Sequence, residues 1–175
     1  MNQPGIRRRR ATDLDGCVAA LALVHEADRY PLNWPADPHR WLREPRPARA
    51  WVAVDADGAV VGHVAVHRLP DRADGPLARP TAEVARLFVA PGARGLALGS
   101  ALLARARRWA SKRGTDLVLD VADGDAAAVA LYERTGWRCT GTSTAPWTAP
   151  DGSPVSLRHY ASPAGHQRRS PSSLC

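Results

Sequence analysis

A short turn between an apolar run and a helix-forming run carries the residues best suited to bind an anion. Residues 84–89 (VARLFV) form the apolar run, which predicts a strand, and Pro91-Gly92 ends it. Residues 94–99 (RGLALG) then lead directly into SALLARARRWASKR, whose composition favours a helix. The N–H groups of such a turn, together with a helix N-terminus, attract negative charge. Arg94 adds a planar cation that suits phosphate oxygens.

A second pattern follows another strand-like run at residues 116–121. Residues 125–137 read DAAAVALYERTGW and predict a helix with Asp125 at its N-terminus. The first turn resembles motif A of the GCN5-related N-acetyltransferase (GNAT) family, Arg/Gln-x-x-Gly-x-Gly/Ala. Residues 125–137 resemble its motif B, Asn-x-x-Ala-x-x-Leu-Tyr-Glu-Lys/Arg-x-Gly-Phe. The departures are Ala97 for the middle glycine, Asp125 for asparagine and Trp137 for phenylalanine.

The resemblance covers roughly residues 5–160 of the 175 and implies a fold. That fold is the GNAT acyl-CoA N-acyltransferase fold, an α/β (α+β) domain with a mixed central sheet of about seven strands and helices on both faces. We expect this domain over residues 1–160. Residues 161–175 are polar and small, so we expect a disordered C-terminal tail there.

The resemblance also implies a donor and its binding residues. It predicts acetyl-CoA as acyl-donor substrate, with no metal, and direct transfer to an amine through a tetrahedral intermediate. Alanine at position 97 fits the turn without strain if its backbone φ is negative. The family's motifs place cofactor binding at Phe88, Val89, Arg94, Gly95, Leu96, Ala97, Leu98, Gly99, Ser100 and Asp125.

Two residues are the predicted catalytic groups. By the resemblance, Tyr132 is the general acid, and a phenol of pKa about 10 stays protonated at neutral pH and can donate to a thiolate. A tyrosine that only packs against the core is the alternative. Glu83, at the start of the central strand, is the first choice of general base, with Asp120 and Glu26 as alternatives.

The acceptor is the least specified part of the prediction. We favour the primary amine of a small molecule. Motif B is also close in pattern to acetyltransferases of the ribosomal-protein type, which modify peptide N-termini. A non-catalytic CoA-binding sensor module is an alternative of a different class. Trp34 and Trp41, after the first helix, could grip an acceptor or could cover the edge of the core.

Composition limits the class of protein. The net charge of +7 suits anionic partners. A basic surface around an anionic cofactor is favoured over dedicated nucleic-acid binding, because no aromatic-basic interleaving supports the latter. The sequence contains no run of 18 apolar residues, so we expect no membrane-spanning helix, and residues 1–16 do not resemble a secretory signal. Three scattered cysteines do not form a disulfide framework. We therefore expect a cytoplasmic protein, with a homodimer left open.

The remaining elements must position these groups. Thr12 or Asp13 is the predicted cap of the first helix, and Asp37-Pro38 opens a short second helix. His63 and His67 share one face of a strand too far apart to hold one metal, and we interpret them as ordinary strand histidines. The predicted strands are residues 6–11, 50–54, 60–68, 84–89, 116–121, 137–142 and 155–160; the predicted longer helices are residues 14–27 and 99–113.

Overall fold

The protein is built on a seven-stranded mixed sheet with the order β1-β2-β3-β4-β5-β7-β6. The structure is a computed structural model that describes residues 5–70 and 80–163. Strands β4 and β5 are parallel, and the other neighbours are antiparallel. This confirms the predicted fold class. The strands are β1 (Gly5–Arg8), β2 (Arg49–Val54), β3 (Val60–Arg68), β4 (Thr81–Val89), β5 (Asp116–Ala122), β6 (Arg138–Thr148) and β7 (Pro154–Ala161).

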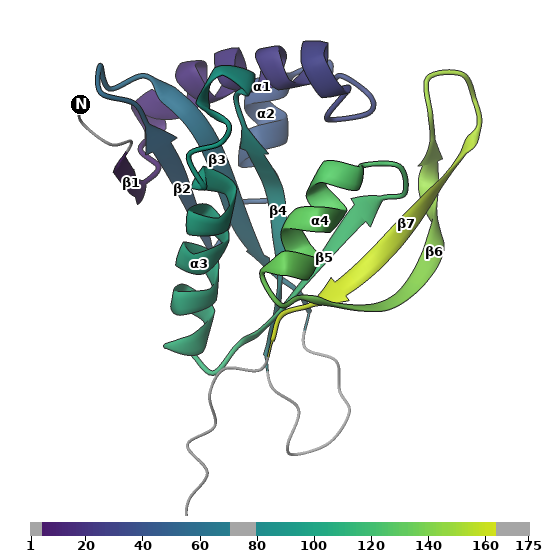
Figure 1. Cartoon of the computed structure of the whole chain (residues 1–175). Helices are drawn as coiled ribbons and strands as arrows, with labels where there is room; N and C mark the ends of the chain where they lie inside the picture. The colour runs from purple at the N-terminus through teal and green to yellow at the C-terminus, as the bar shows by residue number, and fades with distance from the viewer. Residues whose placement is uncertain (1–4, 71–79, 164–175) are drawn as a thin grey trace, which may run out of the picture.

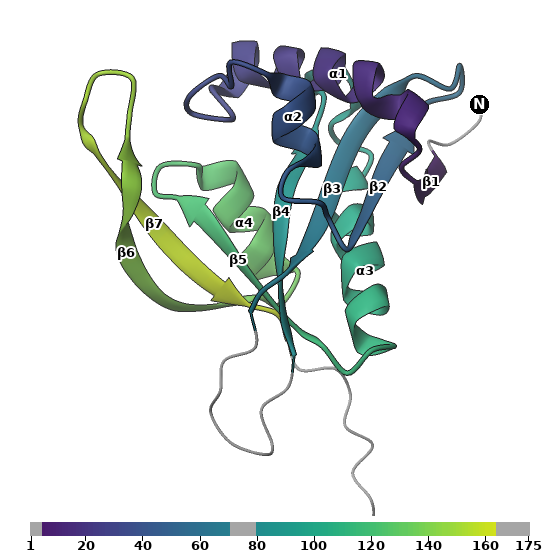
Figure 2. The same cartoon turned by 180° about the vertical axis from the view of Figure 1, so that it is seen from behind.

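Helices cover both faces of the sheet, as predicted (Figures 1 and 2). Helices α1 (Leu14–Asp28) and α2 (Pro38–Arg43) lie on one face, and α3 (Leu98–Ser111) and α4 (Ala126–Arg134) lie on the other. Short 3₁₀ turns precede α1 (Ala11–Asp13) and α3 (Pro91–Ala93). Helix α3, predicted over residues 99–113, packs one face against the sheet, and the buried residues of that face include Leu102, Leu103, Ala106, Trp109 and Ala110.

The element boundaries agree best where local sequence signals are strong. Asp37 caps α2 by accepting a hydrogen bond of 2.8 Å from the Arg40 amide. The first strand is shorter than predicted and ends at Arg8, while β6 is longer and includes Trp147, which we expected in a loop. The last strand includes Ala161, so the tail predicted from 161 is wrong at its first residue. Residues 162 and 163 lie outside any helix or strand, and the rest of that prediction, residues 164–175, lies outside the described residues.

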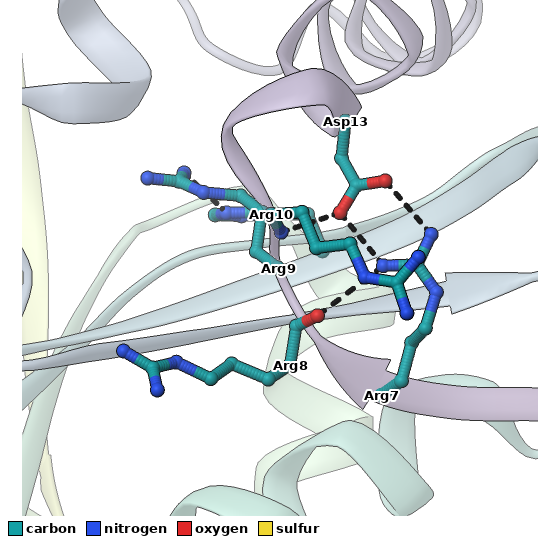
Figure 3. Close-up of polar contacts among 6 residues, drawn as sticks. Arg7, Arg8, Arg9, Arg10 and Asp13 are labelled. Atoms are coloured by element: carbon teal, nitrogen blue, oxygen red, sulfur yellow. Dashed lines mark hydrogen bonds and ion pairs between the residues drawn. The ribbon is translucent and has the colours of Figure 1, made fainter.

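Asp13 is the N-cap residue of α1, as predicted, but its side chain has a different role. Its side chain makes no capping bond to α1. Instead its two oxygens each accept a 2.7 Å bond from the guanidinium of Arg7, and one of them also accepts a bond from the backbone amide of Arg10 (Figure 3). The hydrogen-bonded Arg7 cation lowers the pKa of Asp13. This pair fixes the turn between edge strand β1 and helix α1.

A buried histidine connects β3 to two neighbouring segments. His63 is fully buried. Its Nδ1 donates to the Arg86 carbonyl at 2.8 Å, and its Nε2 lies 2.9 Å from an Arg9 nitrogen that also bonds the Leu42 carbonyl at 2.9 Å. Because Arg9 can only donate, Nε2 must accept, so the imidazole is neutral. Burial lowers the pKa of His63 to about 3 and that of the nearly buried His67 to about 4.

Arg86 attaches helix α2 to strand β4. Its backbone has the left-handed φ of 53°, close to an irregularity in the β3–β4 pairing. Its guanidinium donates to the carbonyls of Trp41 at 2.5 Å and Glu44 at 2.8 Å, and one nitrogen lies 3.1 Å from His67 Nε2. His63 and His67 are therefore parts of a buried polar network, and not ordinary strand histidines as predicted.

Candidate active site

Strands β4 and β5 separate from each other in the middle of the sheet. They pair only where Thr81, Ala82 and Glu83 face Asp116, Leu117 and Val118. Beyond Glu83, β4 continues to Val89 and pairs only with β3, and the two strands diverge (Figure 1). Within the described residues, no strand covers the β5-facing edge of residues 84–89. Such an edge presents N–H and C=O groups to an extended ligand.

Phe88 and Val89, two predicted cofactor-binding residues, lie on this separated part of β4. The Phe88 side chain is buried and stacks on His63, with ring centroids 5.3 Å apart. Val89 pairs with Gly62 of β3. A ligand in the gap would therefore contact the backbone of these two residues.

The predicted anion-binding turn follows directly. Gly95 has φ 80° and Ala97, the N-cap residue of α3, has φ 54°. The condition under which alanine fits this turn without strain, a negative φ at Ala97, is therefore not met. An L-residue in this left-handed conformation costs about 1 kcal/mol relative to glycine because its Cβ approaches the backbone. The turn keeps its shape in spite of the alanine.

The first turn of α3 provides unpaired donors. The N–H groups of Leu98, Gly99 and Ser100 have no acceptor within the helix. A helical N–H bonds to the carbonyl four residues earlier, and for these three residues that carbonyl lies before the helix begins. Gly99 also lets α4 approach, because a Cβ on it would lie 3.1 Å from a methyl carbon of Leu131. Leu96 is more than half exposed, so its side chain leaves the turn open to solvent. These features suit a phosphate group at the helix N-terminus.

Arg94 is not a free cation at this turn. Its guanidinium donates to both carboxylate oxygens of Asp28, at the end of α1. The two side chains are 45% and 41% exposed, so solvent and ligands can reach the pair. A phosphate that binds Arg94 must either displace Asp28 from the guanidinium or share the guanidinium with Asp28.

Tyr132 lies on α4, beside the gap, and is buried. Its ring contacts Trp137 and Tyr160, with centroid distances of 6.2 and 5.8 Å. Burial raises the pKa of Tyr132, and negative charge on Asp125 acts in the same direction. The phenol therefore stays protonated at neutral pH, as a proton donor must. Asp125 itself caps α4 by accepting a 3.0 Å bond from the Ala128 amide.

Two carboxylates lie on the opposite face of the sheet from α3. Glu83 pairs with Val118, and Asp120 is two residues further along β5, so both side chains point to the same face. Burial raises the pKa of Glu83, and the charge of Asp120 adds to this effect. Asp120 Oδ1 accepts a 2.6 Å hydrogen bond from His159 Nδ1. The third candidate base, Glu26, is exposed on α1.

Tyr30 was not among the predicted site residues. Its ring meets Trp41 edge-on at 6.4 Å, and burial raises the pKa of its hydroxyl. The positive charge of Arg86 opposes this rise in pKa, and the negative charges of Asp125 and Glu83 add to it. Trp41 is covered by the Arg86 guanidinium at 4.7 Å, which favours the core-edge role for this tryptophan. Only the position of Tyr30 directly after α1 could have suggested it.

The loop between α1 and α2 bridges to the hairpin of β6 and β7. Leu32 packs against a small buried cluster on that hairpin, and Asn33 donates a 2.8 Å hydrogen bond to the Thr148 carbonyl. The loop therefore closes one end of the surface formed by β5, β7 and β6. The cluster consists of Ala145, Val155 and Leu157.

Within residues 5–70 and 80–163, no group of three or more His, Cys, Asp or Glu side chains is arranged to hold a metal ion. The same part of the chain contains no helix long and apolar enough to cross a membrane.

Comparison with known proteins gives consistent results. A model of the acetyltransferase (GNAT) family matches residues 19–137. An uncharacterized N-acetyltransferase of Schizosaccharomyces pombe is 37% identical over 91 residues, which are 51% of this chain and 51% of that protein. The match thus spans about half the length of that relative.

Solved structures share the fold. The ribosomal-protein-alanine N-acetyltransferase from Brucella melitensis is 26% identical, with a TM-score of 0.66 over 90% of this chain and 98% of that one. Arabidopsis thaliana NAA60 in complex with acetyl-CoA has a TM-score of 0.73 at 15% identity, over 91% of this chain and 97% of that one. The latter similarity concerns the fold alone.

Proposed function

The chain belongs to the acetyltransferase (GNAT) family of acyltransferases, and we propose that it transfers the acetyl group of acetyl-CoA to the primary amine of a small molecule. The observation that carries this proposal is the gap between β4 and β5. An unpaired strand edge, a left-handed turn at a helix N-terminus and a buried tyrosine all meet there.

The donor fits this gap in two parts. The backbone edge of residues 84–89 would pair with the extended pantetheine arm, and the turn from Arg94 to Ser100 would hold the pyrophosphate. Acetyl-CoA supplies the activated acyl group as a thioester. A backbone N–H near Val89 would face the developing oxyanion, and one such donor lowers the barrier by about 3 kcal/mol.

The protein's side chains would move two protons. Tyr132, whose raised pKa keeps it protonated, would donate to the departing thiolate. The acceptor amine enters as an ammonium and must lose a proton before it can attack. The negative charges of Glu83 and Asp120 on the other face of the sheet would attract that ammonium.

The loop between α1 and α2 closes one end of the surface formed by β5, β7 and β6, and this favours a small molecule as the acceptor. The contact of Leu32 with the β6–β7 hairpin and the bond from Asn33 to Thr148 limit the length of an acceptor lying along β7. A peptide N-terminus would need this loop to open. For that reason we place a small amine ahead of a peptide.

The test is an acceptor screen that measures thiol release from acetyl-CoA. The panel contains amine metabolites, aminoglycosides and short peptides. Release with small amines and not with peptides supports the proposal, whereas release with peptides alone reassigns the acceptor to a peptide N-terminus. Saturable acetyl-CoA binding without release from any amine would indicate a CoA-binding sensor.

A further inference from the structure

Four polar side chains stand on four neighbouring strands of the sheet. In the strand order β4-β5-β7-β6 they are Glu83, Asp120, His159 and Ser143. Asp120 and His159 face each other in the β5–β7 register. On β7, Val155 and Leu157 lie on the same face as His159 and pack with Leu32, so this is the sheet face beneath the α1–α2 loop.

Three of these side chains form a continuous hydrogen-bonded chain. His159 Nδ1 lies 2.6 Å from Asp120 Oδ1, and His159 Nε2 lies 2.8 Å from Ser143 Oγ. An ionised carboxylate can only accept, so Nδ1 carries the proton and donates to Asp120. The lone pair of Nε2 then points toward Ser143 and accepts from its hydroxyl. A carboxylate holds an imidazole in this way in serine hydrolases, where Nε2 is the working base.

We propose that His159 is the general base of the acetyl transfer and that Asp120 is its positioning residue; this rests on the proposed function. An N–H bond of the acceptor ammonium breaks and an Nε2–H bond forms on His159. The electron pair stays on the amine nitrogen, which can then attack the thioester. Asp120 stabilises the imidazolium that forms. His159 then gives this proton to water and returns to the neutral imidazole.

The position of His159 suits this role. Asp120 lies two residues beyond the last β4–β5 pair, at the start of the gap, and His159 is directly opposite it on β7. The His159 side chain is 33% exposed, so an acceptor can reach it. In the structure, the Ser143 hydroxyl donates its hydrogen bond to His159 Nε2. An acceptor nitrogen would displace this hydroxyl, or would pass its proton to Nε2 by way of the hydroxyl.

The charges around His159 favour a cation. Asp120 faces it from β5, Glu83 lies one strand further on β4, and the neighbour described on β6 is the neutral Ser143. The adjacent Arg158 points to the other face and pairs with Asp123 at 2.7 Å. An ammonium group would therefore meet negative charge here, and the imidazolium that forms would be stabilised.

The alternative is that Asp120 takes the proton itself and His159 only supports it. The chain contains a matched pair for comparison. His39 Nε2 lies 2.8 Å from Asp15, and both side chains are exposed on the helices α2 and α1. This pair also joins an imidazole to a carboxylate, through Nε2 where His159 uses Nδ1, and it lies outside the site.

The experiment compares His159→Ala, His159→Gln and His39→Ala by thiol release with an acceptor that the wild type acetylates. We expect His159→Ala and His159→Gln to lower kcat/KM by about 10²–10⁴-fold. Added imidazole should restore His159→Ala at least tenfold, because it can enter the exposed space left by the side chain. His39→Ala should keep the wild-type rate and should not respond to imidazole.

Each result decides the proposal. Three results would overturn it while the acetyltransferase function stands. They are wild-type rates in both His159 variants, normal activity in His159→Gln alone, and a slow His159→Ala variant whose rate imidazole does not restore. Asp120→Asn should also slow the reaction, without rescue by imidazole. A wild type that acetylates no amine would overturn the proposed function and this inference together.

Discussion

Acidification from pH 7.5 to 4.5 should destabilise the fold through two buried imidazoles. The pKa of His63 is lowered to about 3 and that of His67 to about 4, from an ordinary value of 6.5. Below pH 6.5, His63 and His67 bind protons in the unfolded chain but stay neutral in the folded protein until the pH approaches their lowered pKa values. Stability is therefore fully present above pH 6.5 and is lost as the pH falls toward the folded values.

The magnitude follows from linkage. Each group costs about 1.4 kcal/mol per pH unit below 6.5, so the two together cost roughly 5 kcal/mol at pH 4.5. That loss is comparable to the whole stability of many domains, which is about 5–15 kcal/mol. The assay is urea unfolding at several pH values, with the free energy of unfolding plotted against pH.

Two carboxyl groups limit the useful range. Asp13, whose pKa is lowered by Arg7, loses its contribution only as the pH falls below its ordinary value of 3.8. Glu83, whose pKa is raised by burial, costs stability when ionised and recovers it on acidification, which opposes the histidines. The difference between the wild type and His63→Gln cancels both effects.

A matched pair of variants makes the result decisive. His63→Gln should halve the slope of stability against pH between 6 and 5, because one of the two buried imidazoles is gone. His39→Gln, which removes an exposed imidazole, should leave the slope as in the wild type. A flat wild-type profile, or a His63→Gln profile parallel to the wild type, would refute the buried neutral state of His63.

Three further predictions concern the site. Ala97→Gly should stabilise the protein by about 1 kcal/mol in thermal unfolding, since glycine adopts φ 54° without strain, whereas Gly95→Ala should destabilise it; equal stability would contradict the strain. Arg94→Ala should weaken acetyl-CoA binding by about 1–3 kcal/mol in calorimetry, and Asp28→Asn should strengthen it; no change in either would place the pyrophosphate elsewhere. Tyr132→Phe should lower turnover with acetyl-CoA affinity within a few-fold; unchanged turnover would refute the acid role.

Local patterns predicted the elements that depend on local signals. The Asp125 cap and the buried face of α3 follow from residues three to four positions apart, and both are present in the structure. Strands β2 and β3 match the runs predicted at residues 50–54 and 60–68, and the Asp57-Gly58 turn between them, where Gly58 has φ 84°, is typical of a hairpin. The order of the last strands, with β7 between β5 and β6, depends on long-range pairing that periodicity does not encode.

Contacts between distant segments were beyond sequence reasoning. Arg94 and Asp28 are 66 positions apart, and His159 and Asp120 are 39 apart, so no local spacing links them. The same holds for Arg9 and His63, 54 positions apart, whose contact turns two unremarkable strand histidines into a buried network.

Calorimetric titration of acetyl-CoA into the wild-type protein tests most directly whether the gap between β4 and β5 is a donor site. Saturable binding with one site per chain, lost when S-acetylpantetheine, which lacks the pyrophosphate and the nucleotide, replaces acetyl-CoA, is the expected result. Absence of heat and of saturable binding at millimolar acetyl-CoA would contradict it, and would mean that Ala97 and the Arg94–Asp28 pair close the turn to the pyrophosphate.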